Sequence, residues 1–121
     1  STISGSAALD AVDYNGVLNT GASVSSISGT TAVEVDSFDL TSYYSAKYFI
    51  TVKDGSDYHA TELLVLCDGT DVLVNEYGTI ISNTSLGTFT ASKVSGSVKV
   101  TFTPTGASNM AIKAAITRMA V

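Results

Sequence analysis

The side chains best suited to chemistry are one histidine, one cysteine and four aspartates in two matching loops. His59 is the only histidine and Cys67 the only cysteine, so the two cannot fill the four ligand positions of a zinc site. Across a hairpin they could form a pair of nucleophile and base. Simpler interpretations make Cys67 a small buried hydrophobe and His59 an exposed or hydrogen-bonded strand residue.

Two loops at 54–57 and 68–71 share the pattern Asp-Gly-Ser/Thr-Asp at an offset of fourteen residues. They hold Asp54, Asp57, Asp68 and Asp71. Two carboxylates can hydrolyse glycosides when they flank a cleft, and acidic loops can bind calcium, although neither loop follows the twelve-residue calcium pattern. Glycine accepts positive φ and aspartate hydrogen-bonds its own backbone. Hairpin turns therefore explain both loops more simply.

The remaining motifs indicate no active site. The sequence has no Gly-x-Ser-x-Gly elbow, phosphate-binding loop or dinucleotide fingerprint. Asn83-Thr84-Ser85 fits the glycosylation sequon, a pattern that is frequent by chance. We expect no catalytic, cofactor-binding or metal-binding residues and no cofactor, and enzymatic activity only if a partner chain completes a site.

Tyrosines are numerous and tryptophan is absent, with six and none respectively. Amphipathic tyrosine rings can form a surface that contacts sugars or proteins. Without tryptophan, packing at the edge of the core is the default interpretation for tyrosines 43, 44, 48, 58 and 77.

Length and composition indicate a single β-rich domain. The chain has 121 residues, of which 45% are hydrophobic and 14% charged, with a formal net charge of −5. This charge repels a phosphate backbone, so nucleic acid is not an expected partner. No apolar run is long enough to cross a membrane, so a membrane is not an expected partner either. The six basic residues are scattered singly: Lys47, Lys53, Lys93, Lys99, Lys113 and Arg118.

The chain divides at about residue 30. Residues 1–30 are rich in Ser, Gly, Ala and Thr with thinly spaced apolar side chains, which predicts an extended N-terminal arm or linker with a short strand near 22–28. The first residue is Ser1 and no initiator methionine is present, which fits processing, trimming or a domain cut from a longer protein. Residues 31–121 form the predicted β-sandwich domain.

Period-two alternation predicts the strands of this domain. Tyr48, Ile50 and Val52 share one strand face, for example. The apolar run at 63–67 suggests burial on both faces, and Pro104 marks a strand end. We predict an all-β antiparallel sandwich, jelly-roll-like or a meander or Greek key, of about seven to eight strands. They lie near 32–38, 46–53, 58–67, 72–77, 86–92, 97–103 and 110–119, with a short apolar piece at 79–82.

Six short segments resemble a known family when taken in order. They are Val35-Asp36-Ser37-Phe38, Tyr44-Ser45-Ala46-Lys47-Tyr48, Ala60-Thr61-Glu62-Leu63-Leu64, Asp68-Gly69-Thr70, Glu76-Tyr77-Gly78-Thr79 and Leu86-Gly87-Thr88-Phe89. The region from about residue 31 to residue 121 resembles a β domain of virion structural and tail-fibre-like proteins of marine tailed phages, notably those infecting cyanobacteria. The resemblance implies a particle component present in many copies and transfers no catalytic or cofactor residue.

We accordingly expect a structural component of a phage particle, located in the virion as a head decoration, tail, fibre or appendage protein. It would act as a homo-oligomer and contact other virion proteins, since Thr, Ser and small side chains desolvate cheaply at interfaces. One alternative is a module that binds a host receptor or glycan through loops carrying Tyr58, His59 and Tyr77. Another is a bacterial surface-layer or adhesin repeat.

Overall fold

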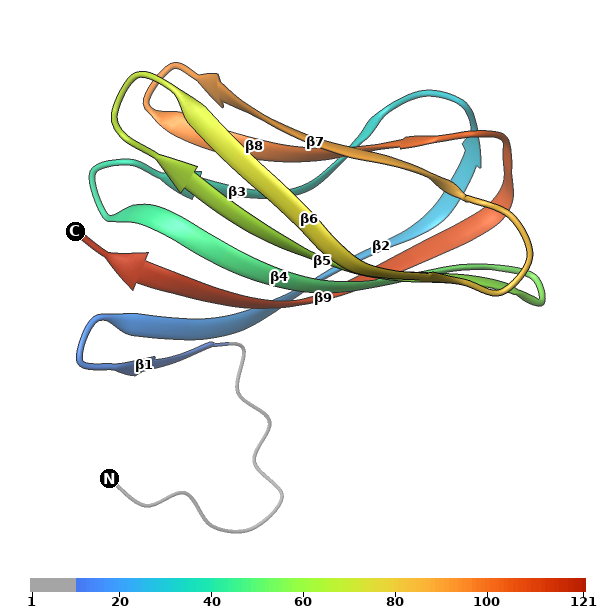
Figure 1. The fold of residues 1–121 in the computed structure, drawn as a ribbon, viewed down its shortest axis with the longest axis horizontal. Helices are drawn as coiled ribbons and strands as arrows, with labels where there is room; N and C mark the ends of the chain where they lie inside the picture. The colour runs from blue at the N-terminus through green and yellow to red at the C-terminus, as the bar shows by residue number, and fades with distance from the viewer. Residues whose placement is uncertain (1–10) are drawn as a thin grey trace, which may run out of the picture.

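The computed structural model describes residues 11–121, which form strands and turns and contain no helix able to span a membrane (Figure 1). The predicted part of the arm at residues 1–10 lies outside the described residues. In chain order the strands are β1 (Ala11–Tyr14), β2 (Val17–Gly29), β3 (Val33–Asp39), β4 (Tyr43–Asp54), β5 (Asp57–Cys67), β6 (Val72–Ile81), β7 (Gly87–Val94), β8 (Ser97–Pro104) and β9 (Ala107–Ala120).

The strands form two antiparallel sheets. One has six strands in the order β1-β2-β9-β4-β5-β6, and the other has three in the order β3-β8-β7. Strands β4, β5 and β6 form a meander, and β9 returns after a long connection to lie beside β4. This 4-1-2-3 arrangement is a Greek key. The predicted all-β sandwich is confirmed.

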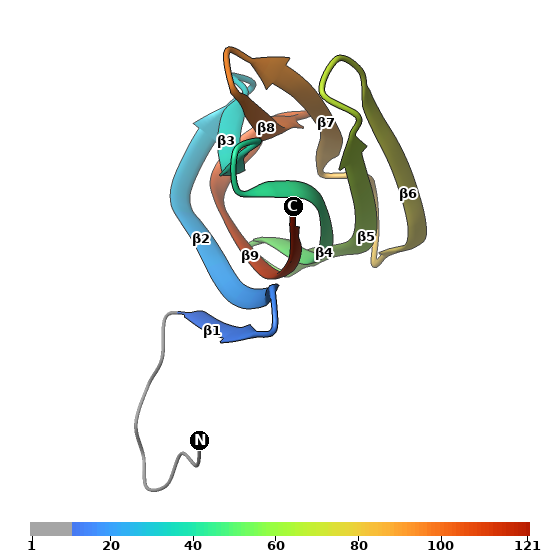
Figure 2. The same cartoon turned by 90° about the vertical axis from the view of Figure 1, so that its left-hand side faces the viewer.

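The core lies between the two sheets, as Figure 2 shows from one end. The predicted face of Tyr48, Ile50 and Val52 on β4 is fully buried, and it meets a buried face of Val98, Val100 and Phe102 on β8. Both strands alternate buried with more exposed positions. Period-two alternation therefore predicted these inner faces correctly, because successive side chains of a strand point to opposite faces.

The described residues contain nine strands, more than the seven to eight predicted. The additional strands β1 and β2 come from the region predicted as an arm, and the short strand predicted at 22–28 is part of the longer β2. Strand β2 pairs with β9 from Val17 to Gly29, with two register shifts, and contributes Ile27 to the core. Pairing with a distant strand lets this sparsely apolar segment form structure that it could not stabilise alone.

The predicted strand at 72–77 and the apolar piece at 79–82 form one strand, β6, which ends at Ile81. A bulge joins them, since Thr61 of β5 faces both Gly78 and Thr79 between the pairs Glu62–Tyr77 and Ala60–Ile80. Gly78 has φ of +67°, a conformation that glycine adopts without a steric penalty. The glycine that looked like a strand end therefore bends a continuous strand.

Candidate interaction surfaces

The two candidates for nucleophile and base lie on one strand and cannot meet. His59 and Cys67 are both in β5, eight residues apart, which corresponds to roughly 26 Å of extended chain. Cys67 is buried, which confirms its interpretation as a small core residue. His59 is only 2% exposed, and its Nδ1 accepts the backbone N–H of Leu86 at 3.2 Å. His59 is thus the hydrogen-bonded strand residue that was one of its predicted interpretations.

The environment of the buried His59 imidazole favours its neutral form. Desolvation lowers the pKa of His59 below its ordinary value of 6.5, and the Glu76 carboxylate opposes this in part. Its Nε2 atom is buried and has no hydrogen-bond partner among residues 11–121. A neutral imidazole fits this site because the Leu86 N–H needs an acceptor at Nδ1.

The four turn aspartates do not form a shared site. Asp68 Oδ1 accepts the backbone N–H groups of Thr70 and Asp71 at 2.9 and 2.8 Å, and these bonds lower the pKa of Asp68. Asp54 instead accepts two backbone N–H groups from 108–109 at 3.2 Å each. Within the described part of the chain, no group of three or more His, Cys, Asp or Glu side chains could hold a metal ion. Hydrogen bonding to backbone accounts for Asp54 and Asp68.

A mostly buried ion pair joins the two sheets. Arg118 of β9 donates from an Nη atom to Asp36 Oδ1 of β3 at 2.6 Å, and the Tyr48 hydroxyl donates to Asp36 Oδ2 at 2.7 Å. Burial raises the pKa of Tyr48, and the Asp36 charge adds to this. The two side chains are only 15% and 11% exposed and join strands of different sheets, so we assign the pair a structural role in fixing how the sheets stack.

Apolar side chains are exposed on the outer face of the six-stranded sheet, with Ile80 lying beyond the pair Glu62–Tyr77 from the others. Leu64 and Leu66 of β5 are 47% and 39% exposed, and they face away from the buried Leu63 and Val65. This overturns the prediction that the 63–67 run is buried on both faces. The strand pairs Leu66 with Leu73 of β6. We call Leu64, Leu66, Leu73 and Ile80 the apolar strip.

Two register rows place the strip beside a polar cluster. Lys47 of β4 lies opposite Leu64, and Glu62 lies opposite Tyr77. The Tyr77 phenol raises the pKa of Lys47, and Glu62 adds to this through an ion pair at 3.6 Å. The two-residue alternation of the sequence places Leu64 and Leu66 on the same strand face. It does not show that no second layer covers that face.

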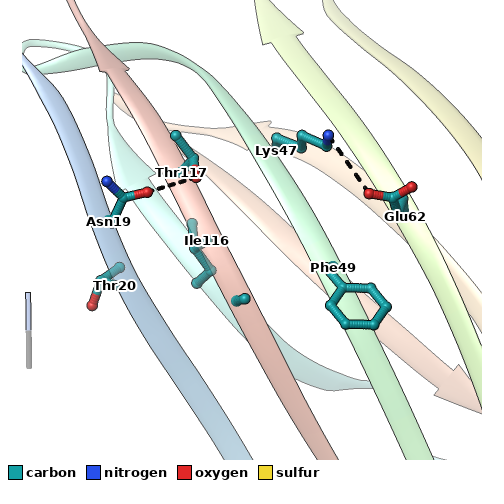
Figure 3. A pocket seen from close by; sticks show the side chains of 8 residues that line it. Asn19, Thr20, Lys47, Phe49, Glu62, Ile116 and Thr117 are labelled. Carbon is teal, nitrogen blue, oxygen red and sulfur yellow. Dashed lines mark hydrogen bonds and ion pairs between the residues drawn. The ribbon is translucent and has the colours of Figure 1, made fainter.

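Figure 3 shows a shallow hollow on the same face, of about 340 Å³. The Phe49 ring stands on one side of it, and the bond from Thr117 Oγ1 to Asn19 Oδ1, 2.8 Å long, crosses the other. The floor is low because Ala115 of β9 pairs with Gly21 on one neighbouring strand and Phe49 on the other. Small side chains on β9 thus leave room for a flat group beside an aromatic ring.

The residues predicted for a receptor-binding end do not come together. Tyr58 is exposed beside the β4–β5 turn, but His59 is buried. Tyr77 lies in the middle of β6 and not in a loop. Only the predicted grouping of these three residues in loops was wrong, because alternation turns His59 inward, next to the outward Tyr58, and Tyr77 lies within a strand.

No protein-family model and no curated protein sequence matches the chain. Solved structures do. The tailspike protein of Acinetobacter phage vB_ApiP_P1 matches with a TM-score of 0.53 and 18% identity, over 100% of this chain and 25% of that chain. The fold is that of a segment of a phage tailspike. The tailspike protein gp49 of Acinetobacter baumannii bacteriophage Fri1, a capsular polysaccharide depolymerase, matches with a TM-score of 0.54 and 15% identity, over 92% of this chain and 21% of that chain.

This chain therefore spans a quarter or less of the length of either tailspike. At these identities the likeness concerns the fold. It agrees with the tail-fibre-like part of the family resemblance, whereas the marine and cyanobacterial part stays a prediction.

Proposed function

We propose that the chain is a structural module of a phage tail appendage, such as a fibre or tailspike, and acts by packing against copies of itself and other virion proteins. The edge strand β6, whose exposed Leu73 and Ile80 belong to the apolar strip, is the observation that carries this proposal. The fold shared with segments of two tailspikes supports placement in an appendage. Its location is then the virion.

Strand β6 has the properties of an edge that another chain covers. It is ten residues long, pairs only with β5 within the described residues, and has no buried position. Ile80 is 73% and Leu73 56% exposed on the outer face, while Val74 and Ile81 are exposed on the other. Strand β6 contains no lysine or proline, residues that often protect a free edge, although it carries the bulge at Gly78 and the inward-facing Glu76. Covering β6 would bury apolar surface at little cost in charge desolvation.

A double substitution of the apolar strip tests this proposal. Leu73→Lys with Ile80→Lys adds two charges to exposed positions, so the fold is retained while apolar association is opposed. We expect light scattering to give an oligomeric mass for the unchanged chain and the monomer mass for the variant.

The matched control carries the same two charges elsewhere. Thr88→Lys with Thr90→Lys places them on exposed positions of β7, in the three-stranded sheet. This control should keep the oligomeric mass. A monomeric unchanged chain, or a Leu73→Lys, Ile80→Lys variant that keeps its assembly state, would contradict the role of β6.

Binding of a host-surface glycan is a second candidate function. The exposed Phe49 ring beside the hollow of Figure 3 is a feature that sugar rings can stack on. One tailspike that shares the fold is a capsular polysaccharide depolymerase, although this chain matches only 21% of it. A glycan array on which neither the unchanged chain nor its assemblies bind would count against this function.

Three further expectations stay predictions. They are the origin in a marine tailed phage, the absence of enzymatic activity, and the exclusion of nucleic acid and membrane as partners. The surface-layer or adhesin repeat stays an alternative that the fold likeness does not favour. Mass spectrometry of purified particles, with immunogold labelling of the chain, would distinguish a head, tail or fibre position from a bacterial surface.

A further inference from the structure

Beyond assembly, we propose that a second hollow on the outer face of the six-stranded sheet binds a carboxylate-bearing saccharide, such as a uronic acid unit of a host-surface polysaccharide. The hollow has a volume of about 390 Å³. Its lining comes from three neighbouring strands and consists of Thr51, Lys53, Tyr58, Ala111 and Lys113.

Two lysines line this hollow although the chain is acidic. Lys53 lies opposite Ala111, and Lys113 lies opposite Thr51, two positions further along β9. The Cα atoms of such diagonal neighbours are about 7–8 Å apart. Neither ammonium forms an ion pair among the described residues. Like charges that line one hollow repel each other, and a carboxylate bound in the hollow would be attracted to both lysines.

Nearby carboxylates do not neutralise the two lysines from the same face. Asp54 and Asp57 pair with each other one position beyond the pair Lys53–Tyr58, so alternation directs them to the opposite face. The Asp54 carboxylate is also held by backbone N–H groups at 108–109. The hollow is therefore a local positive site on a chain whose net charge is −5.

The other lining groups favour a sugar over a simple anion. The Lys53 Nζ lies 5.6 Å from the centroid of the Tyr58 ring, which is 46% exposed. The ring and the Ala111 methyl offer apolar surface to the C–H face of a pyranose, and Thr51 offers a hydroxyl. A nucleic acid fits less well, because its many phosphates would meet the field of the whole acidic chain.

Titration with trigalacturonate, followed by amide NMR shifts and calorimetry, tests this proposal. We expect shifts centred on Tyr58 and Ala111 and an affinity that falls with added salt. Lys53→Gln with Lys113→Gln should weaken binding by about tenfold or more, since two charge-assisted bonds are lost. The methyl ester of the same trisaccharide, which lacks the charges, should bind at least about tenfold more weakly.

Lys99→Gln is the matched control, because Lys99 is an exposed lysine that pairs with Glu34 on the three-stranded sheet. It should leave binding unchanged. Equal loss in Lys99→Gln, equal affinity for the methyl ester, or no shifts with trigalacturonate at millimolar concentration would overturn the proposal. Inorganic phosphate producing the same shifts at the same affinity would also overturn it, by showing a generic anion site. Any of these results leaves the light-scattering test of β6 unaffected.

Discussion

Strands β4 and β6 belong to the same sheet and both pair with β5, yet their surroundings differ completely. Along β4 every second residue from Ala46 to Val52 is buried, whereas β6 has no buried residue. Figure 2 shows why: β4 lies within the sheet, whereas β6 lies outermost, beyond β5. The apolar alternation of a strand is thus converted into burial only where a second layer covers it.

Strand β4 therefore stabilises the fold, whereas β6 is available for contacts with other chains. Strand β4 has neighbours on both sides, β5 and β9. Among the described residues strand β6 has one neighbour, and its apolar side chains are exposed on both faces, namely Leu73, Val74, Ile80 and Ile81. Substitutions should therefore unfold the protein when they affect β4 and its partners and leave stability nearly unchanged on β6.

The largest difference in stability loss is expected between removal of a carboxylate that contacts β4 and removal of one on β6. Asp36→Ala removes the partner of the Tyr48 hydroxyl on β4 and leaves Arg118 mostly buried without its ion pair. We expect a loss of about 3–5 kcal/mol in the free energy of unfolding. Glu76→Ala on β6 should cost roughly 1 kcal/mol or less, since Thr61 keeps its bond to Thr79. Urea unfolding curves for both variants measure this difference, and equal losses would contradict it.

The second largest difference is expected in the stability lost when apolar side chains on the two strands are truncated. Ile50→Ala on β4 removes a fully buried side chain and should destabilise the fold by about 2–5 kcal/mol. Val74→Ala on β6, at a position 42% exposed, should cost about 0.5 kcal/mol. Thermal melts followed by circular dichroism test both variants. If the stability loss of Val74→Ala approached that of Ile50→Ala, β6 would be covered in solution. Repeating the melt on the monomeric Leu73→Lys, Ile80→Lys background would then show whether a second copy covers it.

Stability should also depend on pH through His59, which lies on β5 between Val52 of β4 and Ile81 of β6. Its pKa is lowered in the folded state, so below the ordinary value of 6.5 the unfolded chain binds a proton that the folded chain does not. Stability is then fully present above pH 6.5 and falls as the pH decreases, by at most about 1.4 kcal/mol per unit for one proton.

Melting temperatures between about pH 7.5 and 5.5, a range that brackets the ordinary histidine pKa of roughly 6.5, measure this dependence. The variant His59→Asn places its amide oxygen near the position of Nδ1, the acceptor of the Leu86 N–H, and has no titrating group, so its melting temperature should be nearly constant over the same range. A dependence that persists unchanged in His59→Asn would show that another group is responsible.

The smallest effects are expected at the two turns that connect β4, β5 and β6. Asp54→Ala removes bonds to the distant residues 108–109 and should cost about 1 kcal/mol. Asp68→Ala removes bonds only within its own exposed turn, where water can replace them, so its cost should be smaller. Guanidinium unfolding midpoints measure the stability of the two variants. A larger loss of stability for Asp68→Ala would contradict the greater role assigned to the long-range bonds of Asp54.

Much of the fold was predictable because its signals are local. Alternation located the inner face of β4, and the two Asp-Gly loops located the turns of the meander, where Gly55 and Gly69 have φ of +63° and +100°. The shared pattern Asp-Gly-Ser/Thr-Asp nevertheless forms two different turns. Asp54 pairs with Asp57 around a two-residue loop, whereas the second loop spans 68–71 between the paired Cys67 and Val72. Strand register, which is not local, decides this difference.

The candidate surfaces were less predictable because they depend on what lies above each face. The run at 63–67 looked doubly buried, but hydrophobicity does not show that Leu64 and Leu66 lack a covering layer. Likewise Lys53 and Lys113 are 60 residues apart in the sequence, and only the pairing of β4 with β9 makes them neighbours.

By itself, the sequence determined the all-β class, the turn positions and the inner faces, since φ preferences and the two-residue period act within a few residues. Tertiary structure alone decided that β2 joins the large sheet through β9, that β6 stays uncovered and that two lysines share a hollow. Each of these depends on pairing between distant segments. Local preferences do not specify such pairing, because its free energy comes from surfaces that exist only once the sheets have formed.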